Sequence, residues 1–537
     1  MLDFTARADN AAIMSDAFDP AASGAAPQPG ASPASGAGTR SSLGRLADMW
    51  TKVLHNPSAM IIASTATQSA LRLVSNVILA RLLAPSAFAL TAITALILTG
   101  IQMVSDVGIA ITALREGALS RDDEDRLWTM QLVRGVGVGL IVAAVAVPVA
   151  WIYQDMRLRD VLFALALMPV FQGAQSLYPI LALAHRRLLP STLVELGGRI
   201  VAMTTSILVA LVSPTVWSLV IGTLLAVAFT TLASHVLSGR MPRFLFDRGY
   251  IKRQWRFSRW IQTSSTLTFV GMQIDKALFP FLFGMTALGL YGIGATFAAI
   301  PSQVTQRWSA SVFYPLTVQL LKGDAAARAR LLGVRTTMLL YSTIVTLGVM
   351  AVSPPFFLLF YEPRYHAAAG FAEILAIGTF FEVAESSLRH MPLVEGTPHF
   401  EVWTVIIRLI AFGIAVGVVH LTRAGVVGYA LSYAVGLAAS YGFMVVTCAR
   451  RGYIRPGFDI GLTMVLAVAA IGIYALPIPQ VGKLGLVLQA AIVAVVAGVA
   501  MLTVYVRRGL PSLPAEPAAK TLREAAEDEL GTLPKRA

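Results

Sequence analysis

The chain has 537 residues, of which 56% are hydrophobic and only 13% charged, and its mean hydropathy is +0.70. Soluble globular proteins carry roughly 25% charged residues, so this composition excludes a water-soluble fold and favours an all-α polytopic membrane protein. The single cysteine, Cys448, excludes a disulfide framework and a cysteine-rich metal site, and no cofactor motif is present.

The expected elements begin after a polar tail. Residues 1–45 are rich in Ala, Ser, Gly and Pro and lack an apolar run of signal-peptide length, which predicts a disordered cytoplasmic tail. Apolar runs long enough to cross a bilayer core of about 30 Å then follow, separated by proline, glycine and charge clusters. The fourteen expected spans are 58–83, 86–114, 128–152, 161–184, 190–212, 215–237, 258–284, 286–318, 332–360, 367–392, 400–422, 425–448, 459–477 and 484–506.

These spans fall into two sets of six and a final pair. The longest basic loop separates the sets and is expected to act as a hinge. The expected organisation is a six-helix bundle in 46–237, a basic cytoplasmic linker in 238–257, a second six-helix bundle in 258–449, helices 13 and 14 in 450–508, and a cytoplasmic tail in 509–537.

Charge is distributed unevenly over the loops. Of the 42 Lys and Arg residues, 30 fall in the loops and tails on the side of the N-terminus and five on the opposite side. Positive loops remain in the cytoplasm, which predicts that both termini lie inside. The net charge of +13 therefore reflects topology and contact with anionic membrane lipids, and it argues against a nucleic-acid partner.

The first span of each set ends in a similar turn. Residues 76–93, NVILARLLAPSAFALTAI, align without gaps with residues 276–293, KALFPFLFGMTALGLYGI. Both turns join the first and second spans of their set at the outer end. Duplicated bundles are common in secondary transporters, where the substrate site lies between them.

The same residues carry a resemblance to a known family. LARLLAPSAFALTAI followed by SDVGIAITALRE resembles the first hairpin of the bacterial polysaccharide repeat-unit (Wzx-type) flippases, which belong to the multidrug/oligosaccharidyl-lipid/polysaccharide exporter superfamily. The matching positions in the first hairpin are Ala80, Arg81, Leu83, Pro85, Phe88, Asp106 and Gly108, and a looser pattern matches Asp275, Gly289, Tyr291 and Pro315.

The resemblance implies a fold and a function. The implied fold is a V-shaped pair of bundles that works by alternating access. The implied function is translocation of an undecaprenyl-pyrophosphate-linked oligosaccharide to the periplasmic leaflet for exopolysaccharide or lipopolysaccharide biosynthesis. Such a flippase is not an enzyme, is expected to be ion-coupled, and has a polysaccharide polymerase and a chain-length regulator as candidate partners.

Seven cations lie within the expected spans when Arg259, Arg335 and Arg389, near span ends, are counted with the loops. Arg134 and Arg199 lie near the inner ends, where long side chains can reach the interface. A charge at the centre of a span costs about 2.5–3.5 kcal/mol, so the deeper cations are expected to face a wet cavity or an acid. An anionic lipid-linked oligosaccharide would need such cations, and the candidate substrate-binding residues are Arg72, Arg81, Lys276, Arg307 and Arg408.

Acidic residues in the spans are candidates for ion coupling. Glu382 and Glu385 are three residues apart, so they share a helix face, where they could form a protonation site or pair with Arg408. Asp275 is the third ion-coupling candidate. Glu195 and Arg199, four residues apart, are expected to form a local ion pair.

Three alternative functions were weighed. A cation-coupled multidrug exporter would be expected to have an acidic cavity, which the span cations disfavour. A lipid II flippase shares the fourteen expected spans. A polysaccharide polymerase or ligase needs a long outer loop with catalytic Arg or His, and no expected outer loop is long.

Overall fold

The protein was analysed as a computed structural model, which describes residues 57–475 except 106–119, 185–187, 301, 304, 306–312, 314–315, 318–324, 395–396, 398 and 455. The chain divides into two units, Met1–Lys52 and Val53–Ala537, and the description below concerns the second. All regular elements of the described residues are helices. The expected fourteenth span and both tails lie outside the described residues.

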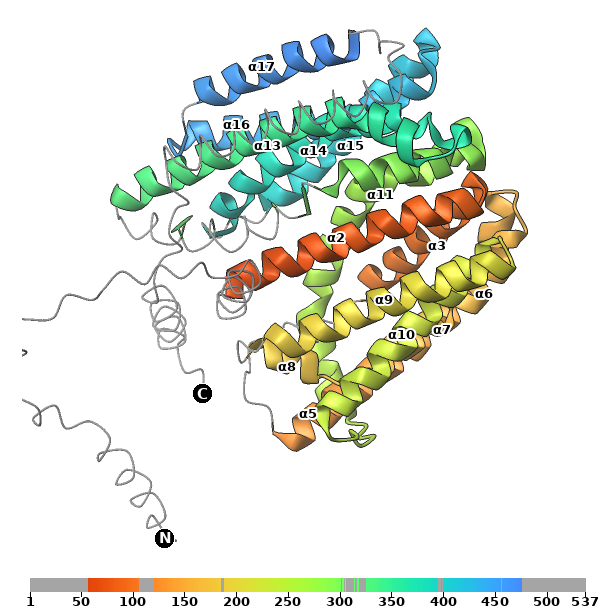
Figure 1. The fold of residues 1–537 in the computed structure, drawn as a ribbon. Helices are drawn as coiled ribbons and strands as arrows, with labels where there is room; N and C mark the ends of the chain where they lie inside the picture. The colour runs from red at the N-terminus through yellow and green to blue at the C-terminus, as the bar shows by residue number, and fades with distance from the viewer. Residues whose placement is uncertain are drawn as a thin grey trace, which may run out of the picture. The chain divides into compact units, whose positions relative to one another are not determined.

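The first bundle is built from eight described helices (Figure 1). Pro85 starts the second of them, since its fixed φ suits a first helical turn, and Gly239 ends the last in the left-handed conformation. The helices are α2 (Pro57–Leu82), α3 (Pro85–Val104), α5 (Arg121–Ile152), α6 (Arg157–Leu165), α7 (Leu167–Ala174), α8 (Tyr178–Ala184), α9 (Leu188–Val212) and α10 (Val216–Ser238).

The expected fourth span, 161–184, is broken into three pieces. Helix α6 passes into α7 at Ala166, and residues 175–177 separate α7 from α8 without helical hydrogen bonding. Pro169 and Pro179 lie in these short helices, and proline removes a backbone donor from a helix. Hydropathy did not predict these breaks, because it depends on side chains and the side chains of 161–184 are mostly apolar throughout. The breaks change only the hydrogen bonding of the backbone.

The second bundle begins with α11 (Arg248–Ala298). Gly284 interrupts this helix with a φ of 81° and a ψ of 168°, at the point where the seventh and eighth spans were expected to meet. Helix α11 starts ten residues before the expected end of the basic linker, because Asp247 caps it by accepting hydrogen bonds from the backbone N–H of Gly249 and Tyr250.

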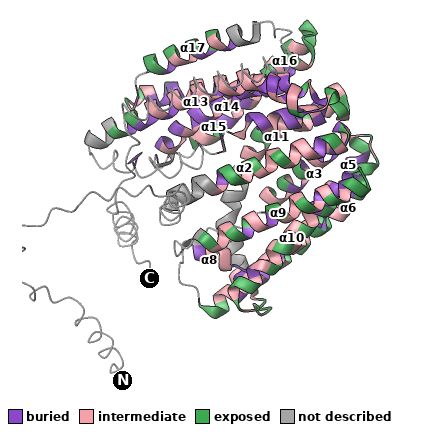
Figure 2. Cartoon of the chain, viewed as in Figure 1, coloured by how far each residue is buried: buried purple, intermediate pink, exposed green. Residues whose placement is uncertain are grey.

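The remaining helices complete the second bundle. They are α13 (Ala325–Phe360), the 3₁₀ turn η1 (Pro363–Tyr365), α14 (Ala368–Val394), α15 (His399–Thr422), α16 (Gly425–Arg450) and α17 (Pro456–Ala475). Helices α14 and α16 pack together and are the most buried spans of the described chain, whereas α15 is largely exposed (Figure 2).

Among the described residues, nine helices are long and apolar enough to cross a membrane. Large apolar side chains on their outer surfaces are exposed, including Val212 at 88% and Leu421 at 83%. In water such surfaces would drive association, whereas in a bilayer they face lipid. The full number of fourteen spans stays a prediction.

The two similar turns meet in space. A Cβ atom added at Gly289 of α11 would lie 2.0 Å from the backbone oxygen of Pro85, so glycine is required for this approach. Leu90 and Ile93 beside the first turn and Leu288 beside the second are buried in one apolar core. The duplicated segments therefore join the two bundles.

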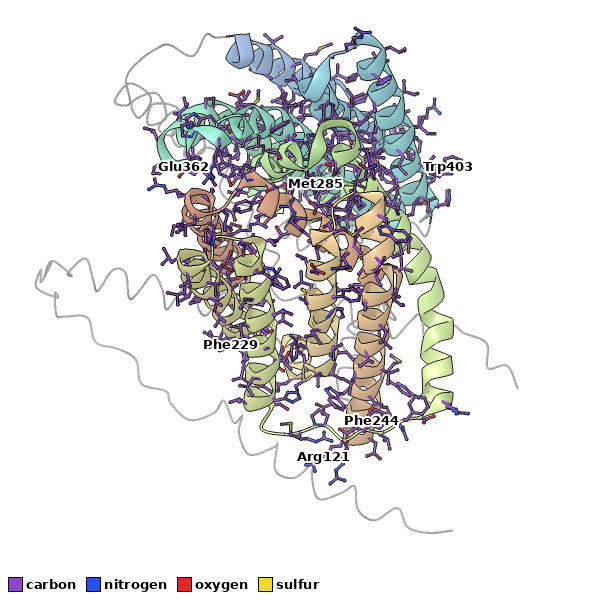
Figure 3. The ribbon with its side chains drawn as sticks, turned by 90° about the vertical axis from the view of Figure 1, so that its right-hand side faces the viewer. Arg121, Phe229, Phe244, Met285, Glu362 and Trp403 are labelled. Atoms are coloured by element: carbon purple, nitrogen blue, oxygen red, sulfur yellow. The ribbon has the colours of Figure 1, made fainter. Side chains whose placement is uncertain are left out.

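The basic linker closes the end of the first bundle at which α5 begins and α10 ends. Arg240 forms hydrogen bonds of 2.6 Å to both carboxylate oxygens of Asp125, which is 3% exposed, and one of 3.1 Å to Glu124. Figure 3 shows Arg121 and Phe244 at this end, far from Met285 and Glu362. The linker is thereby attached to the start of α5.

Candidate functional site

Arg72 is the predicted cation that reaches from one bundle to the other. Its guanidinium, on α2, donates a 2.9 Å hydrogen bond to the side-chain oxygen of Gln303, a neutral partner from the second bundle. Arg199 of α9 lies close enough for its charge to act on Arg72. None of the ion pairs among the described residues includes Arg72.

Glu195, one turn before Arg199 on α9, has a partner on α2. Glu195 of α9 accepts a 3.1 Å hydrogen bond from Gln68 of α2, in place of the expected ion pair with Arg199. Both Glu195 and Arg199 are exposed. The faces of α2 and α9 at this level thus combine two arginines with one carboxylate, which favours an anionic ligand.

Lys276 also has a neutral partner. Its ammonium donates a 2.8 Å hydrogen bond to the side-chain oxygen of Gln273, one turn earlier on α11, and it is partly buried. No ion pair among the described residues includes it. Arg307, the third deep candidate, lies outside the described residues.

Arg81 is placed at the contact between the outer ends of the bundles. Its side chain is exposed and donates to the backbone oxygen of Phe360 at 3.3 Å, while its own backbone oxygen accepts from Arg364 at 3.3 Å. Tyr365 donates a 2.7 Å hydrogen bond to the backbone oxygen of Leu83. The contact thus joins the end of α2 to the segment between α13 and α14.

Arg408 and Glu385 form a buried ion pair. Pairing with Arg408 was one of the two alternatives that the sequence left open for Glu382 and Glu385. The guanidinium of Arg408 on α15 lies 2.7 Å from Glu385 on α14, and the two residues are 5% and 1% exposed. Glu385 also accepts from Ser440 at 2.6 Å and from Arg389 at 3.0 Å. Arg408 is therefore electrically compensated, unlike Arg72 and Lys276.

Asp275 lies in an aromatic environment with one unused oxygen. Its Oδ2 accepts a 2.6 Å hydrogen bond from Tyr291, and its backbone oxygen accepts one of 2.7 Å from Tyr429. Its Oδ1 is buried and has no hydrogen-bond partner in the structure. A buried carboxylate with a free oxygen can receive a proton or a small cation.

The three predicted ion-coupling acids all lie within electrostatic reach of one tyrosine. Tyr433 of α16 lies within electrostatic reach of Asp275, Glu382 and Glu385, and also of Arg408. Glu382 is partly buried, whereas the other two acids are buried. The structure therefore brings Asp275, Glu382 and Glu385 into one polar region of the second bundle, apart from Arg72.

One buried network was missed by sequence reasoning. Arg335 of α13, counted as a loop cation, is 3% exposed and forms an ion pair with Asp459 of α17. Tyr441 and Ser387 complete this network. The available signal was Asp459 itself, since an acid at the start of an apolar run indicates a buried partner.

The described residues contain no group of three or more His, Cys, Asp or Glu side chains that could hold a metal ion. The arrangement they do form consists of uncompensated cations near the bundle interface and paired or half-satisfied acids within the second bundle. Such an arrangement offers positive charge to an anionic group.

Known proteins resemble this chain in sequence and in fold. Residues 78–370 match the family described as "Polysaccharide biosynthesis protein". A curated relative, the amylovoran biosynthesis protein AmsL of Erwinia amylovora, is 20% identical over 252 residues, which are 46% of this chain. The match spans 65% of the length of that relative.

Two solved structures share the fold. The lipid II flippase MurJ, in an inward closed conformation, superposes with a TM-score of 0.65 at 11% identity, covering 83% of this chain and 99% of MurJ. An inward-facing multidrug resistance MATE family transporter of the MOP superfamily superposes with a TM-score of 0.56 at 14% identity, covering 75% and 95%. The expected all-α polytopic fold and the resemblance to a polysaccharide biosynthesis family are confirmed.

Proposed function

The chain belongs to the polysaccharide biosynthesis protein family, and on this basis we propose that it is a flippase for an undecaprenyl-pyrophosphate-linked oligosaccharide. The cargo would move from the cytoplasmic to the periplasmic leaflet of the bacterial inner membrane, for exopolysaccharide or lipopolysaccharide assembly. Both termini would lie in the cytoplasm, as the loop charges predict. A polysaccharide polymerase and a chain-length regulator are the proposed protein partners.

The uncompensated charge of Arg72 is the observation that carries this proposal. A guanidinium that is partly buried between two bundles, and whose hydrogen-bond acceptor among the described residues is the neutral amide of Gln303, keeps its charge for binding a phosphate. Lys276 has the same property, because Gln273 is also neutral. We propose that Arg72, Lys276 and Arg307 contact the pyrophosphate, and that Arg81 acts at the outer end of the path.

The driving force is proposed to be an ion gradient. Asp275 supplies the binding group, because its free Oδ1 lies in a buried region where an extra proton or cation would be held strongly. Glu382 and Glu385 share the surroundings of Tyr433 with Asp275, and their own charges would respond to occupancy there. Arg408, being paired with Glu385, is assigned to this region rather than to the cargo.

Complementation of a deletion strain tests the proposal. Without the gene, cells should stop exporting polysaccharide and accumulate the lipid-linked oligosaccharide. Wild type and Arg159→Ala should restore export, because Arg159 is an exposed outer-loop residue paired with Asp160. Arg72→Ala should fail while reaching the membrane in normal amounts, and Arg72→Lys should restore export in part.

Two outcomes would count against it. Unchanged export by Arg72→Ala and Lys276→Ala would remove these residues from the cargo path. Normal levels of lipid-linked oligosaccharide in the deletion strain, together with new sensitivity to cationic drugs, would indicate a multidrug exporter instead.

A further inference from the structure

A polar cavity lies within the first bundle, away from Arg72 and from the acids of the second bundle. It measures about 310 Å³ and lies where α3, α5, α7 and α8 meet. Ligand cavities range from about 300 to 1,000 Å³, so this one suits a single ring rather than a lipid chain. Its polar lining residues are Gln102, Gln131, Arg134, Gln172, Gln175 and Ser176.

The cavity is created by the break between α7 and α8. Gln131 of α5 donates to the backbone oxygens of Gln172, Gly173 and Gln175, at 3.1, 3.3 and 3.1 Å, where α7 ends. The oxygen of Gln172 also accepts from the backbone N–H of Gln175 at 3.3 Å. Non-helical backbone at membrane depth is tolerated where it is buried in protein or lines a cavity, and broken helices form the binding sites of many transporters.

Further side chains support the break from behind. Trp128 of α5 and His235 of α10 each form a hydrogen bond with the backbone oxygen of Ala174, at 3.1 and 2.8 Å. Ser234 of α10 accepts from the backbone N–H of Ser176 at 3.0 Å. The break is thus held from two neighbouring helices, which is more support than a simple kink requires.

Arg134 turns into the bundle instead of reaching the interface as the sequence suggested. It donates to the backbone oxygen of Gln102 at 2.8 Å and lies 3.4 Å from the hydroxyl of Ser105. Gln102 in turn donates to Gln172 at 2.9 Å. Both glutamines and Arg134 remain partly exposed, so a ligand can reach them.

The lining chemistry selects the ligand. No acid lines the cavity, which argues against a cation as the ligand. Its four glutamine side chains offer a ligand those amide atoms that are not already bonded to one another, to backbone oxygens or to Thr230. Amides pair with hydroxyls, which are likewise donors and acceptors. We propose that this cavity is a sugar site that holds one hydroxyl-rich ring of the cargo oligosaccharide at the inner end of the first bundle.

This inference rests on the proposed function for the source of the sugar, but its test does not depend on transport. The full chain in lipid nanodiscs is mixed with free glucose, galactose, N-acetylglucosamine or glucuronic acid, and binding is read by saturation-transfer NMR. At least one sugar should give a signal. The double variant Gln102→Met and Gln172→Met, which keeps side-chain volume, should weaken that binding by roughly tenfold or more.

Controls separate the site from the fold. Gln154→Met, the same replacement at an exposed position in an outer turn, should bind as wild type does. Ile180→Trp fills the cavity without removing an amide, so it should also abolish binding. It replaces the double variant in this test if the double variant does not fold. Equal binding by wild type and the folded cavity variants, or no binding of any of the four sugars by wild type, would overturn the sugar site.

Failure of this test and failure of the flippase proposal are distinguishable. A deletion strain that accumulates lipid-linked oligosaccharide would sustain the flippase even if no free sugar bound. Sugar binding at the glutamines would sustain the site even if export proved independent of the gene.

Discussion

Glu385 shows how single residues keep charge inside the second bundle. It is almost completely buried, but its charge is paired with Arg408 and Arg389. Both of its carboxylate oxygens accept hydrogen bonds, one of them from Ser440 as well. Buried ion pairs of this kind stabilise weakly as a unit but are costly to break, because the remaining partner is left charged and unpaired.

Glu385→Gln should therefore destabilise the protein strongly. Removal of one partner from a buried ion pair costs about 3–5 kcal/mol, and thermal unfolding in detergent should show a large decrease in Tm. The double variant Glu385→Leu with Arg408→Met should recover most of that loss. A double variant as unstable as the sum of the single variants would contradict the pairing.

Asp275→Asn tests the proposed coupling role at the same scale. The amide keeps an acceptor for the hydroxyl of Tyr291 but cannot carry the charge that a proton or cation requires. We expect normal amounts of folded protein and loss of ion-dependent export. Tyr291→Phe is the control, since it removes the hydrogen bond from the tyrosine hydroxyl while leaving the carboxylate. Export by Asp275→Asn at the wild-type rate would exclude Asp275 from coupling.

At the scale of helices, the contact between α3 and α11 requires that residue 289 is a glycine, which has no side chain. Gly289→Ala would place its Cβ 2.0 Å from the oxygen of Pro85, so the two helices must separate. Overpacking of this kind costs about 1–3 kcal/mol, which thermal unfolding would detect. Gly292→Ala, on the same helix with open space around it, should be neutral or slightly stabilising. Equal effects of the two variants would refute the close approach.

The segment around η1 joins the outer ends of the two bundles. In an alternating-access cycle this contact must open, and Tyr365→Phe removes its 2.7 Å hydrogen bond to Leu83. Loss of about 1 kcal/mol should increase the outward-open population by roughly fivefold. Tyr361→Phe, in the same aromatic cluster, is the matched control.

Distances between spin labels on the outer turns would measure this change. Cysteines at Gln154 and Arg423 suit the labels, after replacement of the buried Cys448 by alanine. Tyr365→Phe should lengthen the label distance and Tyr361→Phe should leave it unchanged. An unchanged distribution in Tyr365→Phe would mean that this contact does not restrain opening.

Apolar runs predicted the helices well, because a bilayer demands about 20 apolar residues per span whatever the packing. They also placed the turn at Gly284 between two spans. The break between α7 and α8 was not predictable, since Gln131 of another helix satisfies it. Arg335 was assigned to a loop for a similar reason: its partner, Asp459, is far away in sequence.

For the site, the sequence identified the charged residues but could not say which of them pair. Arg72 and Arg408 look alike in sequence, as single arginines within apolar runs. Only the fold shows that Arg408 faces Glu385 whereas Arg72 faces the amide of Gln303. Partner identity depends on helix packing, which hydropathy does not encode.

For the whole molecule, the proposed sites lie in both bundles. The first bundle supplies Arg72 for the phosphate and the glutamine-lined cavity for the sugar. In the same proposal the second bundle supplies Lys276 for the phosphate and Asp275 for the ion. The two bundles meet where Gly289 approaches Pro85.

Reconstituted transport tests the central claim most directly. Purified protein in liposomes is given a fluorescent undecaprenyl-pyrophosphate oligosaccharide in one leaflet, with an ion gradient, and its arrival in the other leaflet is followed by chemical quenching. Transfer should be fast with wild type and with Arg159→Ala, and should fall to the rate of empty liposomes with Arg72→Ala. Transfer at the rate of empty liposomes by the folded wild-type protein, with protons and sodium each tried, would contradict the account.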